Sequence, residues 1–187
     1  LSGSSNIIFI YSADSPDLFT RVVSTLEQLN LNIVQARIVS VEDNGFDLYT
    51  LHILGSDNKL IDDVMDQNHI VEVMQRNLRR EQFQVRQHRP PRILRNFDVP
   101  TRINFRQQAD KKLTIMEVST GDMPGLLSRV GETLDQAGVR VHNARITTLG
   151  EQAEDIFYIT TRDDEAMITD AVMQNNLRHS LVEALKI

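Results

Sequence analysis

The chain contains 187 residues, of which 41% are hydrophobic and 25% are charged, and its formal net charge at pH 7 is −6. These values are typical of a soluble globular protein with one or two domains, and the acidic balance argues against nucleic-acid binding, for which a basic surplus is usual. The absence of cysteine excludes disulfides and thiolate metal sites and fits a cytoplasmic location, and no apolar run approaches the roughly 20 residues needed to cross a membrane.

The first half of the chain predicts the element order β-α-β-β-α. Residues 2–6 are small or polar, and we expect residues 1–6 to be a flexible cloning remnant outside the fold. The apolar periodicity predicts strands at Ile7–Tyr11, Ile33–Val41 and Phe46–Leu54, helices at Pro16–Leu29 and Leu60–Leu78, and a hairpin turn at Asp43–Gly45. Gln82–Gln87 is a candidate fourth strand, which would complete a ferredoxin-like β-α-β-β-α-β unit.

An arginine-rich connection joins the two halves. Its cations are Arg76, Arg79, Arg80, Arg86, Arg89, Arg92 and Arg95, and the only acid among them is Glu81. Such a run is typical of a solvated linker and of a helix end, where cations suit the helix dipole. The alternative is a docking surface for an acidic partner or domain.

The second half predicts the same order. Strands are expected at Lys112–Thr120, Val139–Leu149 and Asp155–Thr161, and helices at Leu126–Ala137 and from about Asp164 to Leu185. The chain ends after this last helix, so we expect Thr101–Phe105 to fill the vacant sheet edge beside the strand at Leu113. The predicted domains are therefore 7–88 and 101–187, with a linker at 89–100.

The two halves are copies of one pattern, 108 residues apart. Asp14-Ser-Pro-Asp-Leu-Phe, Ala36-Arg-Ile and Asp47 recur without a gap as Asp122-Met-Pro-Gly-Leu-Leu, Ala144-Arg-Ile and Asp155. A repeat of this length is a pair of small domains rather than a solenoid, because each copy is large enough to bury a core of its own. The fold class is therefore predicted as α+β, with two ferredoxin-like domains in tandem, antiparallel sheets and the helices on one face.

Motifs for catalysis are missing from the sequence. The histidines His52, His69, His88, His142 and His179 are scattered and show no metal-ligand spacing. The chain also lacks a phosphate-binding glycine loop and a Gly-x-Ser-x-Gly elbow. We therefore expect neither a catalytic residue nor a metal or cofactor in this part of the protein.

The turn from Asp122 to Leu127 is the best candidate for a ligand site. The first amides of a helix lack partners within the helix and carry partial positive charge, so the carboxylate of an amino acid can bind there. Gly125 would let a ligand approach the backbone, and Asp122 would face an ammonium group. The alternative is purely structural, because Asp122 and Pro124 are also common residues at a helix start.

This turn and the strand Val141–Ile146 resemble the ACT family of small-molecule sensor domains. Residues Gly150–Phe157, the tandem spacing and Phe97–Phe105 resemble, more closely, the C-terminal end of the bifunctional uridylyltransferase/uridylyl-removing enzymes that act on the PII nitrogen-signalling protein. The resemblance implies paired ACT domains that sense glutamine and control a nucleotidyltransferase domain and a metal-dependent hydrolase domain. Those domains, with their Mg and UTP, are expected to lie outside this chain.

The resemblance also implies a set of ligand-binding residues. In the second copy they are Asp122, Met123, Gly125, Leu126, Asn143, Ala144 and Arg145, and in the first copy Asp14, Leu18, Gln35, Ala36 and Arg37. Asp17 stands where the family has glycine, and its charge near a ligand carboxylate would cost about 1 kcal/mol even in a water-like dielectric. The first turn is therefore expected to be the poorer site, or a site where the acid contacts the ammonium group.

Three functions remain open from the sequence. The favoured hypothesis is a regulatory module in which glutamine binds between the copies and changes their packing. A structural dimerisation module with vestigial sites is the alternative, since sheets of this kind readily pair. A ferredoxin-like nucleic-acid binder is disfavoured, because the chain lacks aromatic stacking positions and a positive face. Whether the copies pair within one chain or between two is not fixed by the sequence.

Overall fold

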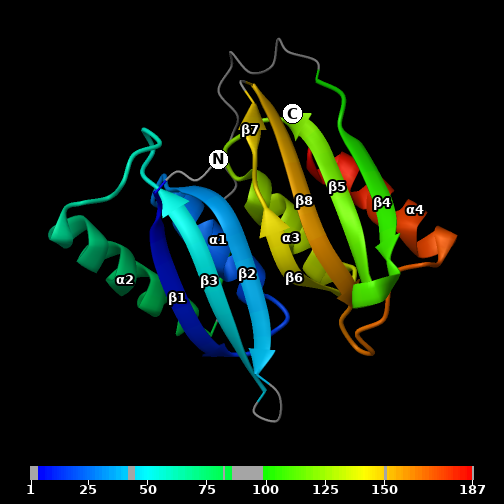
Figure 1. Ribbon diagram of the computed structural model, residues 1–187, viewed down its shortest axis with the longest axis horizontal. Helices are drawn as coiled ribbons and strands as arrows, with labels where there is room; N and C mark the ends of the chain where they lie inside the picture. Colours follow the sequence, from blue (N-terminus) through cyan, green and yellow to red (C-terminus); the bar gives the residue numbers. More distant parts are fainter. Residues whose placement is uncertain (1–3, 42–44, 82, 86–98, 150, 187) are drawn as a thin grey trace.

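One antiparallel sheet carries the whole fold, with the helices packed on one of its faces (Figure 1). The computed structural model describes residues 4–41, 45–81, 83–85, 99–149 and 151–186. The predicted α+β class is confirmed. Within the described residues, no helix is long and apolar enough to cross a membrane.

The first copy follows the predicted order. Its elements are β1 (Asn6–Ala13), α1 (Leu18–Gln28), β2 (Asn32–Val41), β3 (Phe46–Leu54) and α2 (Val64–Leu78). β1 begins at Asn6, whose side chain bonds the backbone of Ile61, so residue 6 belongs to the fold and not to a flexible leader. Helix α2 begins four residues later than predicted, because the Asp63 carboxylate caps it by accepting from the amide of Met65 at 2.7 Å.

The second copy repeats this order after an extra strand. Its elements are β4 (Arg102–Gln108), a 3₁₀ turn (Ala109–Lys111), β5 (Leu113–Gly121), α3 (Leu126–Gln136), β6 (Val139–Arg145), β7 (Thr148–Leu149), β8 (Gln152–Thr161) and α4 (Ala171–Ala184). Helix α4 also begins later than predicted, because Asp170 caps it through the amide of Met173. The amide of Ile168, which precedes it, bonds the buried Thr114 hydroxyl instead of a helical carbonyl.

The strand order is β1-β3-β2-β6-β8-β5-β4, with the short β7 also paired to β8. β4 pairs with β5, with Arg102 opposite Ser119 and Gln108 opposite Leu113, which is the pairing predicted for the edge of the second copy. The fourth strand predicted for the first copy is not present at residues 83–85. Residues 82, 86 and 87 of that prediction lie outside the described residues, as do Arg86, Arg89, Arg92 and Arg95.

The two copies join edge to edge through β2 and β6 (Figure 1). Gln35 lies opposite Arg145, Ala36 opposite Ala144 and Arg37 opposite Asn143. Because Ala36 and Ala144 are equivalent positions of the repeat, a pseudo-two-fold axis passes between them. The copies therefore pair within one chain in this structure.

A shared core lies under the helices. α1 and α3 approach closely, and a Cβ added at Gly131 would lie 2.5 Å from the Thr20 hydroxyl oxygen. Phe19 of the first copy packs edge-on against Phe157 of the second, with the ring centroids 6.5 Å apart. Since apolar side chains of both copies are buried together, separating the copies would expose part of the core.

Candidate ligand site

A cavity of about 750 Å³ lies between the two copies at the turn that the sequence singles out. The second copy contributes the turn from Asp122 to Leu127 together with Ile146, Thr148, Glu151, Ala153 and Asp155, and the first contributes Glu27, Asn30–Val34, Ser56 and Asn58. Its volume is within the range of roughly 300–1,000 Å³ that is common for small-molecule sites.

The turn is shaped by one glycine. Gly125 has a φ of +79°, a left-handed conformation that favours glycine, and α3 begins directly after it. The amide of Asp122 donates to the carbonyl of Glu151 at 2.9 Å, which ties the turn to the start of β8. Met123, Gly125 and Leu126 are buried, whereas Asp122 and Pro124 are exposed, so the acid is open to a ligand.

The amides at the start of α3 already hold a carboxylate of the chain itself. Glu27, near the end of α1, accepts from the amide of Leu127 at 2.9 Å and from that of Ser128 at 3.1 Å. The Ser128 hydroxyl donates to the same carboxylate. The sequence predicted an anion at this helix start, and the structure places a side chain of the other copy there.

Among the acids that line the cavity, Asp155 has a strongly shifted pKa. It is only 1% exposed; its Oδ1 accepts from the amide of Thr147 at 3.1 Å, and its buried Oδ2 has no hydrogen-bond partner among the described residues. Burial, together with the nearby charges of Asp122, Glu154 and Glu27, raises its pKa from 3.8 to about 7, against the lowering effect of the hydrogen bond from Thr147. Although Asp122 is exposed as a whole residue, partial desolvation of its carboxyl also raises its pKa. No lysine or arginine is among the described residues that line the cavity.

The turn of the first copy is filled by arginines from the second. Arg140 on β6 bonds Asp14 at 3.2 Å and Asp47 at 2.7 Å, and Arg162 bonds Asp14 at 3.4 Å and the carbonyl of Pro16 at 3.0 Å. Asp17, which is the repeat equivalent of Gly125, has a φ of −97° and pairs with Arg21 at 2.6 Å. Leu18 is buried in the core, so the predicted residues of this half meet protein groups.

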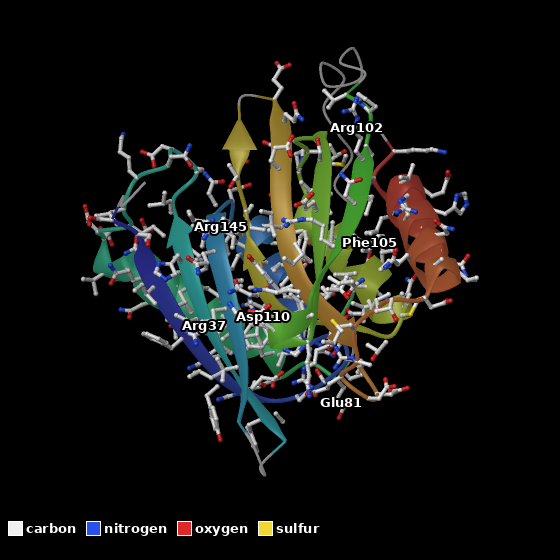
Figure 2. The ribbon with its side chains drawn as sticks, turned by 45° about the vertical axis from the view of Figure 1, so that its right-hand side comes forward. Arg37, Glu81, Arg102, Phe105, Asp110 and Arg145 are labelled. Atoms are coloured by element: carbon white, nitrogen blue, oxygen red, sulfur yellow. The ribbon has the colours of Figure 1, made fainter. Side chains whose placement is uncertain are left out.

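The predicted strand residues are not part of the cavity. Gln35, Ala36, Arg37, Asn143, Ala144 and Arg145 lie at the centre of the seam between β2 and β6, and none of them lines the cavity. Ala36 and Ala144 are buried, whereas Arg37 and Arg145 are exposed (Figure 2). Because side chains alternate along a strand, these arginines point to the sheet face opposite the alanines. Of the predicted residues, only Asp122, Met123, Gly125 and Leu126 line it.

Four important residues were missed from the sequence: Glu27, Asn32, Asp155 and Arg140. A signal for them existed in the repeat itself. Glu27 and Asp135 are acids at equivalent positions, and Asp135 accepts a hydrogen bond from Thr20 just as Glu27 accepts from Ser128, the equivalent of Thr20. Asn32 and Arg140 are also equivalent, and they differ in charge.

Sequence comparisons relate nearly the whole chain to one group of enzymes. Similar proteins described as bifunctional uridylyltransferase/uridylyl-removing enzymes occur in Aliivibrio fischeri MJ11 (36% identity, 92% of this chain), Psychrobacter sp. PRwf-1 (37%, 95%) and Acinetobacter baylyi (35%, 95%). The chain spans only 20% of the length of each of these relatives.

Other comparisons add little. No family model matches the chain. A solved structure from Galdieria sulphuraria aligns with 95% of this chain and 89% of its own, but its TM-score of 0.30 and sequence identity of 14% are too low to carry an argument. The sequence relatives are decisive: this chain is homologous to the C-terminal part of the bifunctional uridylyltransferase/uridylyl-removing enzymes.

Proposed function

We propose that this chain is a regulatory module that binds glutamine between its two copies and controls the uridylyltransferase and uridylyl-removing activities of a larger enzyme acting on PII. The cavity between the copies is the observation that carries the proposal, because a ligand there contacts both halves at once. Homology to the C-terminal part of the enzymes supports the regulatory role. The ACT-like turn supports an amino acid as the ligand.

Glu27 provides a route from binding to a change in packing. In this proposal the α-carboxylate of glutamine replaces the Glu27 carboxylate at the amides of Leu127 and Ser128. That exchange breaks the hydrogen bonds of Glu27 between α1 and α3. The hydrogen bond between Thr20 and Asp135, on the other side of the pseudo-two-fold axis, remains. A ligand shifts an equilibrium only if it binds one arrangement better than the other, and the displaced Glu27 supplies that difference.

The chemistry of the enzyme belongs to its other parts. The nucleotide, the metal and the PII protein would be bound outside this chain, which spans 20% of the length of its relatives. Within the described residues, no group of His, Cys, Asp and Glu is arranged to hold a metal ion. The module would therefore act through its contacts with the rest of the enzyme.

Titration calorimetry tests the proposal directly. Glutamine should bind the folded chain, and in the full-length enzyme it should change the ratio of the two activities at concentrations that match this affinity. Mutating Glu27 or Asp155 should shift the affinity and the concentration dependence together. If neither glutamine nor another free amino acid binds the folded chain, sensing is wrong.

A structural pairing module is the second candidate, and one observation favours it. Glu27 already satisfies the amides at the start of α3, so the helix start needs no ligand. In this case Glu27 and Asp135 only hold the copies together. Retained pairing of the copies with no amino-acid binding would select this function over sensing.

A further inference from the structure

The two halves contain the same pair of acids at their turns. Asp14 and Asp47 in the first copy are equivalent to Asp122 and Asp155 in the second. Asp47 and Asp155 are both nearly inaccessible, with 2% and 1% of their surface exposed. A buried carboxylate is costly unless a cation or hydrogen-bond donor neutralises it. The groups that face the two acids in each copy therefore indicate what their site binds.

The acids of the first copy are neutralised by the chain itself. The Arg140 guanidinium reaches across the seam from β6 and bonds both carboxylates, at 3.2 Å from Asp14 and 2.7 Å from Asp47. Arg162 adds a second cation next to Asp14. Here the carboxylates and the guanidinium form hydrogen-bonded ion pairs, which are the strong kind.

Within the part of the chain that the structure describes, no lysine or arginine forms an ion pair with the acids of the second copy. The equivalents of Arg140 and Arg162 are Asn32 and Leu54, and the Asn32 side chain donates to the carbonyl of Gly55 and to Asn58 instead. Where the arginine would reach, the structure has the cavity, which Asn32, Asp122 and Asp155 all line. None of the residues that the structure describes gives Asp155 Oδ2 a hydrogen bond.

The first copy therefore shows what the second copy would bind. We propose that Asp122 and Asp155 bind a protonated amine from solution, in the place that the Arg140 guanidinium takes against Asp14 and Asp47. The inference rests on the proposed function in one respect, since the amine is the α-ammonium group of the amino acid. The proposal adds Asp155 and Asn32 to the ligand site. It also predicts one ligand per chain, because Arg140 already occupies the equivalent place in the first copy.

Two substitutions test the amine site. Asn32→Arg introduces the arginine of the first copy and should fill the site, lowering the affinity for glutamine by about tenfold or more. Asp155→Asn keeps the shape, removes the charge and should weaken glutamine binding to a similar extent while leaving the melting temperature unchanged or raised. Asp47→Asn is the matched control, and it should lower the melting temperature but change the affinity by less than about twofold.

A second ligand completes the calorimetric experiment. 4-Carbamoylbutanoate, which is glutamine without its amine, should bind the wild type much more weakly than glutamine, and it should lose little from Asp155→Asn. The titrations should give one glutamine per chain. Glutamine binding that is insensitive to both Asn32→Arg and Asp155→Asn, or a second equal site removed by Asp47→Asn, would overturn the amine site and leave sensing intact.

Ethylammonium chloride tests the amine site even if the proposed glutamine sensing fails. If no amino acid binds, the proposed function fails, and the amine site is then judged by this simple cation. Stabilisation of the wild type by ethylammonium, absent in Asn32→Arg and Asp155→Asn, would support the amine site on its own. Equal responses of the wild type and both variants would reject it.

Discussion

Ala36 and Ala144 lie directly opposite each other across the seam between β2 and β6, and each is the repeat equivalent of the other. Both are almost fully buried, with 1% and 0% of their surface exposed. Among the described residues, three pairs form the ladder between β2 and β6, and the amide of Ile146 adds a bond to the carbonyl of Val34. The two alanines at its centre are small, which leaves room for the packing of neighbouring side chains.

Enlarging one of these side chains should loosen the contact between the copies. Ala144→Leu should lower the free energy of unfolding by about 1–3 kcal/mol, because extra methylenes in a packed core force neighbouring groups to shift. Urea denaturation followed by circular dichroism measures this change. Ala171→Leu, at an exposed position at the start of α4, is the matched control and should have little effect. A loss of the same size in both variants would contradict the role of the seam.

Removing the Glu27 carboxylate should tighten glutamine binding. In Glu27→Gln the amides of Leu127 and Ser128 lose their charged partner, so the ligand carboxylate no longer competes with it. The same change should lower the free energy of unfolding by about 1 kcal/mol, since a negative charge near a helix start is stabilising. Calorimetry and urea denaturation measure the two effects.

Asp135→Asn is the control for Glu27→Gln. It changes the equivalent acid, which accepts from Thr20 on the opposite side of the pseudo-two-fold axis. It should leave glutamine affinity unchanged. Weaker binding in Glu27→Gln would show that Glu27 holds the ligand rather than competes with it.

Asp155 should make the protein less stable as the pH rises from 4 to 7. Its pKa is 3.8 in the reference state and about 7 in the fold, mainly because of burial. Between these values the folded protein holds a proton that the unfolded chain releases, so the free energy of unfolding falls with rising pH, by up to about 4 kcal/mol in total. Below pH 3.8 both states are protonated and the full stability is present.

The comparison of wild type with Asp155→Asn isolates this contribution. Other shifted groups, such as Asp135 with its pKa raised to about 6, contribute equally to both proteins. The difference in the free energy of unfolding between variant and wild type should therefore grow from pH 4 to pH 7 and level off above it. A difference that is constant with pH would mean that Asp155 titrates normally in the fold.

A charge at Gly125 should weaken glutamine binding beyond the effect of backbone strain. Because Gly125 has a φ of +79°, Gly125→Ala alone should cost about 1–2 kcal/mol of stability. Gly125→Asp adds a negative charge at the start of α3, as in the first copy at Asp17. The affinity of Gly125→Asp relative to Gly125→Ala measures the effect of the charge, and equal affinities would place the ligand carboxylate elsewhere.

Local sequence patterns were sufficient to predict most of the fold. Apolar periodicity and the repeat predicted the element order, and the vacant edge beside Leu113 predicted the pairing of β4 with β5. The helix starts were less accurate. Asp63 and Asp170 cap α2 and α4 several residues after the predicted starts, because a cap depends on the backbone geometry before the helix and not on apolar periodicity.

The site was predicted only in part, because its electrostatics depend on residues far apart in the chain. The turn at Asp122–Leu126 lines the cavity, and its binding of a ligand stays a prediction. However, Glu27 reaches the amide of Leu127 from 100 residues away, and Arg140 reaches Asp14 from 126 residues away. Periodicity and local motifs contain no information about such contacts. The repeat offered two clues, the equivalent acids Glu27 and Asp135 and the difference in charge between Asn32 and Arg140.

Because β4 lies before the start of the second repeat, the repeating sequence unit is shorter than the unit that forms the sheet of the second copy. The repeat begins again near Leu113, but the sheet of the second copy includes β4, which precedes it and buries Ile103. A fragment that starts at Leu113 would lack an edge strand and would leave β5 with an open row of amides and carbonyls. Expression of the second copy alone should therefore begin no later than about residue 101, or the product will be prone to aggregation.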